Sequence, residues 1–158
     1  MNRPELIYET PPRYAVAAFA GVIGLLIGVD IVFALVFPEL LCFMMITAIS
    51  ESALFYFIIP RKYQIFADRL RVVLGGWIKF DVPFSTIRQA RVARSIDAFV
   101  YWGLRMATSG EGVVEILRRG GGLDLVISPI DRDTFLEQLD QALAASNRNA
   151  TPPKWRVI

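Results

Sequence analysis

The sequence predicts a membrane α-helical hairpin of two transmembrane helices, followed by a mainly β barrel or sandwich of about seven strands that one C-terminal helix caps. Three observations support this fold class. Two long apolar segments follow each other early in the chain. Short runs of alternating apolar and polar residues, separated by turn signals, fill the middle of the chain. One amphipathic stretch, from Asp131 to Leu143, ends the predicted domain.

The apolar residues are concentrated in the first third of the chain. Of the 158 residues, 54% are hydrophobic and only 20% are charged, which is low for a soluble domain. Between Tyr14 and Ile59 the only charged residues are Asp30, Glu39 and Glu51. The chain therefore combines an apolar segment with a second part of ordinary composition.

Both apolar segments are long enough to cross a bilayer. As helices at ~1.5 Å rise per residue, residues 14–37 and 40–59 would measure roughly 36 Å and 30 Å. Pro38 and Glu39 leave room only for a tight turn, and Pro60 ends the second helix. Two alternatives stay open. One is a signal peptide, although the first segment exceeds the ~7–15 apolar residues typical of one; the other is a hairpin inserted into one leaflet.

The charges that flank the hairpin predict its orientation. Arg3 and Arg13 precede the first segment, Arg61 and Lys62 follow the second, and the turn carries only Glu39. Since cytoplasmic flanks collect Lys and Arg, both termini are expected in the cytoplasm. The predicted parts are a cytoplasmic N-terminal segment (1–13), the hairpin (14–60), a β domain (61–145) and a flexible tail (146–158).

Three glycines in the first helix form a candidate contact face. Gly21, Gly24 and Gly28 share one side of the helix, and the Gly24–Gly28 spacing lets another backbone approach closely. This face packs either on the second helix of the same chain or on another copy in a homo-oligomer.

Two acids within the apolar segments are candidate functional residues, because a carboxylate at that depth is costly. Asp30 lies near the turn and Glu51 near the middle of the second segment. Three interpretations stay open: hydroxyl groups of Thr47, Ser50 and Ser52 satisfy Glu51 locally, a partner membrane protein contacts the acids, or they conduct ions or protons.

Seven strands and one helix are predicted after the hairpin. The strands are expected at 63–67, 70–74, 77–82, 87–94, 105–108, 112–117 and 123–128, while 96–104 gives no clear signal. Gly75 and Gly76 suit a two-residue hairpin turn, so an antiparallel arrangement is expected. Asp131 is the predicted N-cap of the helix. Its predicted apolar stripe consists of Phe135, Leu136, Leu139, Ala142 and Leu143.

The segments YQIFADRLRVVLGGWIKFDVPFSTI and VISPIDRDTFLEQL resemble the bacterial pleckstrin-homology-like (PH-like) domains found behind pairs of transmembrane helices in small membrane proteins. The resemblance covers roughly residues 61–143. It implies a PH-like barrel without a catalytic site, and a role in scaffolding, complex assembly or lipid contact. It also implies a bacterial inner (plasma) membrane location.

Catalytic, cofactor and metal sites are not expected. The chain has no histidine, and its one cysteine, Cys42, lies in an apolar segment. From Arg61 to Ile158 there are 15 bases and 10 acids, a net charge of +5, which is too low to predict nucleic-acid binding.

Basic residues of the β domain could face anionic lipid. The candidates are Arg61, Lys62, Arg69, Arg71, Arg88, Arg91, Arg94 and Arg105. An ordinary solvated surface is the alternative. The aromatic residues Phe99, Tyr101 and Trp102 could enter the membrane interface, but core packing is the favoured expectation.

The resulting hypothesis is a membrane-tethered, non-enzymatic adaptor, scaffold or assembly factor that binds another membrane protein through its hairpin or its β domain. The alternative is a module that binds anionic lipid at the cytoplasmic leaflet. A transporter or enzyme subunit that uses Asp30 and Glu51 is the least favoured hypothesis.

Overall fold

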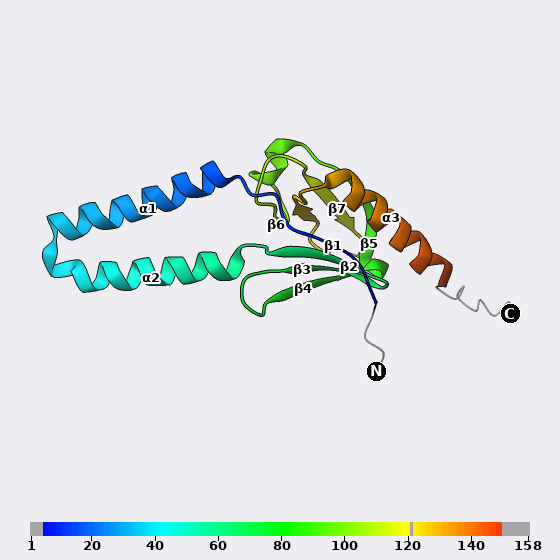
Figure 1. The fold of residues 1–158 in the computed structure, drawn as a ribbon, viewed down its shortest axis with the longest axis horizontal. Coiled ribbons are helices and arrows are strands. Elements are labelled where there is room, and N and C mark those ends of the chain that lie inside the picture. The colour runs from blue at the N-terminus through cyan, green and yellow to red at the C-terminus, as the bar shows by residue number, and fades with distance from the viewer. Residues whose placement is uncertain (1–4, 121, 150–158) are drawn as a thin grey trace.

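The protein consists of a long helical hairpin that projects from one end of a β domain (Figure 1). A computed structural model describes residues 5–120 and 122–149. Eight strands, three α-helices and three short 3-10 turns occur in these residues. The structure therefore supports a mainly β domain with a C-terminal helix.

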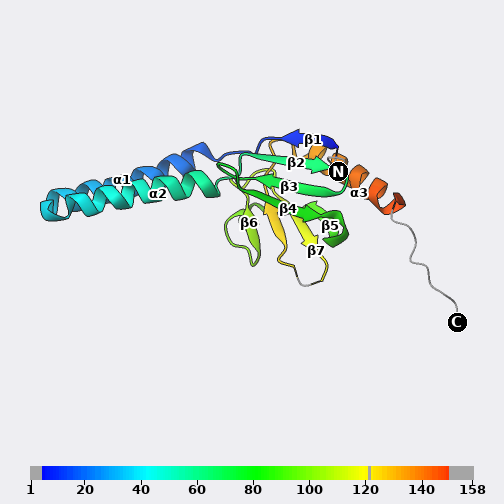
Figure 2. The same cartoon turned by 90° about the horizontal axis from the view of Figure 1, so that it is seen from below.

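The two hairpin helices lie side by side and run in opposite directions (Figures 1 and 2). Helix α1 spans Val16–Val36, and helix α2 spans Leu41–Ile58. The 3-10 turn Pro38–Leu40 joins them, with Pro38 at its start, where a missing N–H does least harm. In the described residues, one helix, Pro38–Ile58, is long and apolar enough to cross a membrane, whereas the apolar stretch Ala20–Val36 is shorter. Membrane insertion of both helices stays a prediction.

The first sheet is an antiparallel meander of four strands in the order β1-β2-β3-β4. Its strands are β1 (Leu6–Thr10), β2 (Lys62–Phe66), β3 (Arg69–Val73) and β4 (Lys79–Pro83). Strand β1 corrects the predicted division of the chain, because the N-terminal segment 1–13 was expected to lie outside the β domain. Glu9 lies opposite Gln64 and Thr10 opposite Tyr63. The hairpin is therefore an insertion between the first two strands of this sheet.

The second sheet has the order β5-β7-β8-β6. Its strands are β5 (Ile87–Val92), β6 (Leu104–Met106), β7 (Val114–Arg118) and β8 (Leu125–Ile127). Strand β6 pairs with β8 in parallel, contrary to the antiparallel expectation. The reason is the crossing segment between β5 and β6, which contains the 3-10 turn Ser95–Ala98 and delivers β6 to the far edge of the sheet.

One apolar core lies between the two sheets and helix α3. Fully buried side chains come from the first sheet, from the second sheet and from α3: Tyr63, Ile65, Leu70, Val72, Val82, Val114, Ile116, Leu125, Ile127, Phe135 and Leu139. The predicted stripe of α3 is confirmed, with Leu136 and Leu143 partly buried at its margin. The core explains the alternation of the strands, since every second side chain faces inward.

Helix α3 spans Arg132–Asn149 and begins at the predicted cap. The Asp131 carboxylate accepts hydrogen bonds from the Thr134 hydroxyl at 2.7 Å and from the Thr134 backbone N–H at 3.2 Å, and these two bonds lower the pKa of Asp131. The flexible tail predicted from residue 146 is wrong for 146–149, where the helix continues. The rest of that predicted tail, 150–158, lies outside the described residues.

Candidate functional site

The hairpin is attached to the β domain by hydrogen bonds from both of its ends. The Tyr14 hydroxyl donates to the Pro60 carbonyl oxygen at 2.5 Å and so joins the bases of the two helices. The Ala15 N–H donates to the Thr108 carbonyl oxygen at 3.0 Å, and the Arg61 N–H donates to that of Val73 at 2.7 Å. These hydrogen bonds connect the base of the hairpin to strand β3 and to the segment that follows β6.

The loop between β3 and β4 packs against the end of α2. A Cβ added at Gly75 would lie 1.5 Å from the Tyr56 carbonyl oxygen, so only glycine allows this approach. Gly76 has a φ of +67°, as expected for a left-handed turn position. The loop extends to Trp77, because the Leu74 N–H donates to the Ile78 carbonyl oxygen at 3.0 Å. It is thus longer than the predicted two-residue turn.

The structure brings the two acids of the hairpin to one cavity. Asp30 from α1 and Glu51 from α2 both line a cavity of about 200 Å³ between the helices. Its other lining residues are Ser52 and five apolar side chains, Ile23, Leu26, Ile27, Ala48 and Phe55. Sequence spacing alone could not place the two acids together, because their distance depends on the rotation of both helices.

Two of the three hydroxyl groups near Glu51 bond elsewhere, whereas Ser52 lines the same cavity as Glu51. The Thr47 hydroxyl donates to the Met44 carbonyl oxygen at 2.8 Å, and the Ser50 hydroxyl donates to that of Ile46 at 2.7 Å. Within residues 5–120 and 122–149, no hydrogen bond or ion pair is found for Asp30 or Glu51. Local satisfaction of Glu51 by these two hydroxyls is therefore wrong.

The glycine face of α1 is open. A Cβ added at Gly21, Gly24 or Gly28 would meet no atom within 4 Å, so these glycines do not pack on α2. The interpretation that they serve contact between the two helices is therefore wrong. Gly24 and Gly28 instead line an outward groove with Leu25, Val29, Val32 and Phe33. A contact with another chain stays a prediction.

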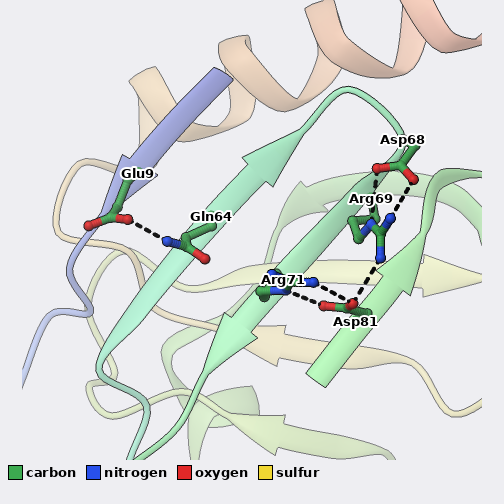
Figure 3. Close-up of polar contacts among 6 residues, drawn as sticks. All are labelled: Glu9, Gln64, Asp68, Arg69, Arg71 and Asp81. Atoms are coloured by element: carbon green, nitrogen blue, oxygen red, sulfur yellow. Dashed lines mark hydrogen bonds and ion pairs between the residues drawn. The ribbon is translucent and has the colours of Figure 1, made fainter. Parts of the chain in front are cut away.

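Two predicted lipid-facing arginines are already paired on the outer face of the first sheet (Figure 3). Arg71 binds the Asp81 carboxylate with two nitrogens, at 2.6 Å and 2.8 Å. Arg69 reaches the same carboxylate at 3.1 Å and Asp68 at 2.9 Å. The hydrogen bond from Arg71, followed by that from Arg69, lowers the pKa of Asp81. Because two arginines are paired with two aspartates, the cluster carries little net charge and should attract anionic lipid only weakly.

Two further predicted basic residues also have acidic partners. Lys62 contacts Glu9 of β1 at 2.9 Å, and Glu9 also accepts a hydrogen bond from Gln64 (Figure 3). Arg91 donates to Glu115 at 2.5 Å, and the Tyr101 hydroxyl donates to the same carboxylate at 2.8 Å.

The other predicted basic residues do not form a single patch. Arg88 lines a polar groove beside α3, together with Arg119 and Asp140. Arg61, Arg94 and Arg105 are exposed, and Arg105 lines a cavity at the base of the hairpin. The predicted basic set is therefore divided among several surfaces of the domain.

Core packing was expected for three aromatic residues, Phe99, Tyr101 and Trp102. It is confirmed only for Tyr101, which packs against a small second core. Trp102 and Phe99 are exposed. Trp77 was expected to begin a strand, but it is exposed in the β3–β4 loop. The sequence did not identify Trp77 as a surface residue, because it does not show where that loop lies in the fold.

The described residues contain no group of three or more His, Cys, Asp or Glu residues arranged to hold a metal ion. Cys42 is exposed on α2. The Tyr63 hydroxyl donates to the Met106 carbonyl oxygen at 2.7 Å, and burial raises its pKa. It thus acts as a core hydrogen-bond donor.

No protein-family model, no curated protein and no solved structure matches this chain. Functional inference therefore depends on the geometry of the hairpin and of its junction with the β domain.

Proposed function

We propose that the protein is a membrane-tethered, non-enzymatic adaptor whose hairpin inserts into the bilayer and binds another integral membrane protein. The observation that carries this proposal is the exposure of the hairpin. Large apolar side chains are exposed along both helices, among them Leu25, Leu35, Ile46, Ile49 and Leu54. A soluble protein would bury such a surface. Two adjacent apolar helices of this length fit the hydrocarbon core of a lipid bilayer.

The position of the hairpin within the fold supports the same proposal. It leaves the β domain at one end and projects away from it, so the domain covers only its base (Figure 1). The basic residues that flank its ends, Arg13, Arg61 and Lys62, favour a cytoplasmic β domain. The resemblance to bacterial PH-like domains behind helix pairs supports a bacterial inner membrane location.

The shared acidic cavity supports partner binding through the hairpin. Two carboxylates at membrane depth are costly unless they are protonated or paired. A basic or hydrogen-bonding side chain of a partner helix would offset that cost. The open glycine face of α1 offers a second surface for close helix contact.

Topology is tested with reporter fusions at residue 158 and at the Pro38–Glu39 turn. We expect the C-terminal reporter to be active in the cytoplasm and the turn reporter to be active outside. If carbonate washing extracted the protein, or if the C-terminal reporter were active outside, the proposed insertion would be contradicted.

Partner binding is tested by affinity capture in mild detergent followed by mass spectrometry. We expect Asp30→Asn combined with Glu51→Gln to remove a membrane-protein partner that the wild-type chain retains. Glu39→Gln is the matched control, because it neutralises an exposed acid in the turn outside the cavity. Capture of the same partner by the double variant, at wild-type membrane levels, would exclude the acids from binding.

A further inference from the structure

Two segments of the β domain expose apolar side chains beside the hairpin. We call these six side chains the apolar rim: Trp77, Ile78, Ile96, Phe99, Val100 and Trp102. Trp102 is 99% exposed and Trp77 is 82% exposed. Two tryptophans with this exposure leave a large apolar area uncovered, which indicates a surface that another phase or molecule covers.

Contacts place both segments at the hairpin end of the domain. The Trp77 ring lies 6.0 Å from the ring of Phe57 in the last turn of α2. Phe99 lines a cavity of about 240 Å³ together with Val22 of α1 and Phe55 of α2. Figure 2 shows that β6, which follows the second segment, lies closer to the hairpin than β5 and β7.

The depth of these contacts can be compared with the dimensions of a bilayer. Helix α1 has 21 residues, so its length is about 32 Å, close to the ~30 Å of a hydrocarbon core. With the hairpin inserted, the bases of the helices therefore reach the interfacial layer. Phe99 lines one cavity with Ala15, which precedes α1, and with Phe55 in the last turn of α2, so this part of the rim lies at the level of the helix bases.

The chemistry of the rim fits that layer. Tryptophan is enriched at membrane interfaces, where its ring contacts apolar surface and its N–H stays hydrated. Lys79, Arg94 and Arg105 are exposed cations within three residues of a rim residue in the chain, and a fourth exposed cation, Arg61, follows the end of α2. Arg61 lies over the ring of Tyr56, 5.0 Å from its centroid, at the base of α2. Cations in this position attract anionic headgroups.

We propose that the apolar rim is a membrane-contact surface that rests in the interfacial layer of the leaflet from which the hairpin emerges. The contact holds the β domain against the bilayer by two loops, one on each side of the hairpin base, in addition to the covalent tether. This inference rests on the proposed insertion of the hairpin and adds a fixed orientation of the domain on the membrane.

The test uses the full chain in lipid vesicles that contain anionic lipid, with single-tryptophan variants. Trp155 is replaced by Phe in all of them, and either Trp77 or Trp102 is retained. Lipids brominated near the headgroup or near the chain end quench fluorescence at those depths. We expect shallow bromines to quench Trp77 and Trp102, with a blue-shifted emission and low quenching by aqueous iodide.

Two matched controls use a chain with all three native tryptophans replaced by Phe. Ala67→Trp places the probe in the exposed β2–β3 turn, about 16 Å from the hairpin base along five-residue strands. It should be quenched by iodide and not by lipid. Ile49→Trp lies in the middle of α2 and should be quenched most by deep bromines.

The controls separate the two proposals. If Ile49→Trp is quenched by deep bromines while Trp102 and Trp77 behave like Ala67→Trp, the rim contact is overturned and insertion stands. If the rim tryptophans are shielded from both lipid and iodide, a protein covers them and the lipid contact is also overturned. Absence of lipid quenching for Ile49→Trp would overturn insertion and the rim contact together.

Discussion

The hairpin and the β domain use apolar side chains in opposite ways. In the β domain, Tyr63, Leu70 and Phe135 are fully buried between the sheets and α3. In α1 and α2, no described side chain is buried, although these helices are more apolar than the strands. The domain therefore contains its own core, whereas the apolar side chains of the hairpin stay exposed, as the proposed insertion into a bilayer requires. The predictions below test this contrast.

The largest expected effect comes from removing the hairpin in two different ways. A hairpin-less chain, in which a short Gly/Ser linker joins residues 1–15 to 60–149, should fold as a soluble β domain. Its ends are already adjacent, because the Tyr14 hydroxyl contacts Pro60 at 2.5 Å. Residues 61–149 alone lack β1 and should lose cooperative unfolding, since β2 then loses its edge partner. Circular dichroism during heating measures both. Equal cooperative melting of the two chains would show that β1 is dispensable.

Phe135→Ala in the hairpin-less chain should lower the free energy of unfolding by roughly 3–5 kcal/mol, because it opens a cavity at the centre of the core. Glu137→Ala, on the exposed side of the same helix, is the control and should change stability little. Urea denaturation measures both variants. A Phe135→Ala midpoint equal to that of the control would argue against α3 as a core element.

Gly75→Ala and Gly24→Ala compare the junction with the free side of the hairpin. The new methyl group at residue 75 would overlap the Tyr56 carbonyl oxygen, so we expect a loss of about 1–3 kcal/mol and a changed Trp77 emission. The methyl group at residue 24 meets no atom and should leave the monomer unchanged. Thermal unfolding of the full chain in detergent provides the measurement. Equal unfolding temperatures would mean that the loop does not pack on α2.

The smallest expected effect concerns the acid side of the pH profile. Arg71 and Arg69 lower the pKa of Asp81 below its ordinary value of 3.8. Asp81 therefore contributes stability that is fully present above its unfolded pKa and is lost as pH falls through the lowered folded value. When the pH is lowered from about 5 to about 3, the free energy of unfolding of the hairpin-less chain should fall less with Asp81→Asn than without it. If the urea midpoints of the two chains changed with pH along parallel lines, Asp81 would not contribute to the pH dependence of stability.

The sequence by itself determined the parts whose signals are local. Apolar length and flanking prolines predicted the helices of the hairpin, strand and turn patterns predicted seven of the eight strands, and the apolar spacing from Phe135 predicted the buried face of α3. These signals are local because helical and strand periodicity, turn preferences and caps act over a few residues. The exclusion of catalytic chemistry also came from composition, and it stays a prediction.

Only the tertiary structure decided the features that join distant residues. Strand β1 pairs with β2 across the whole hairpin, and β6 lies parallel to β8 after a crossing segment. Asp30 and Glu51 share a cavity because of how the helices rotate against each other. The exposure of Trp102 and the pairing of Arg71 with Asp81 are likewise invisible in the local sequence. Such contacts form between residues far apart in the sequence, and the sequence around each residue does not indicate which partner it contacts.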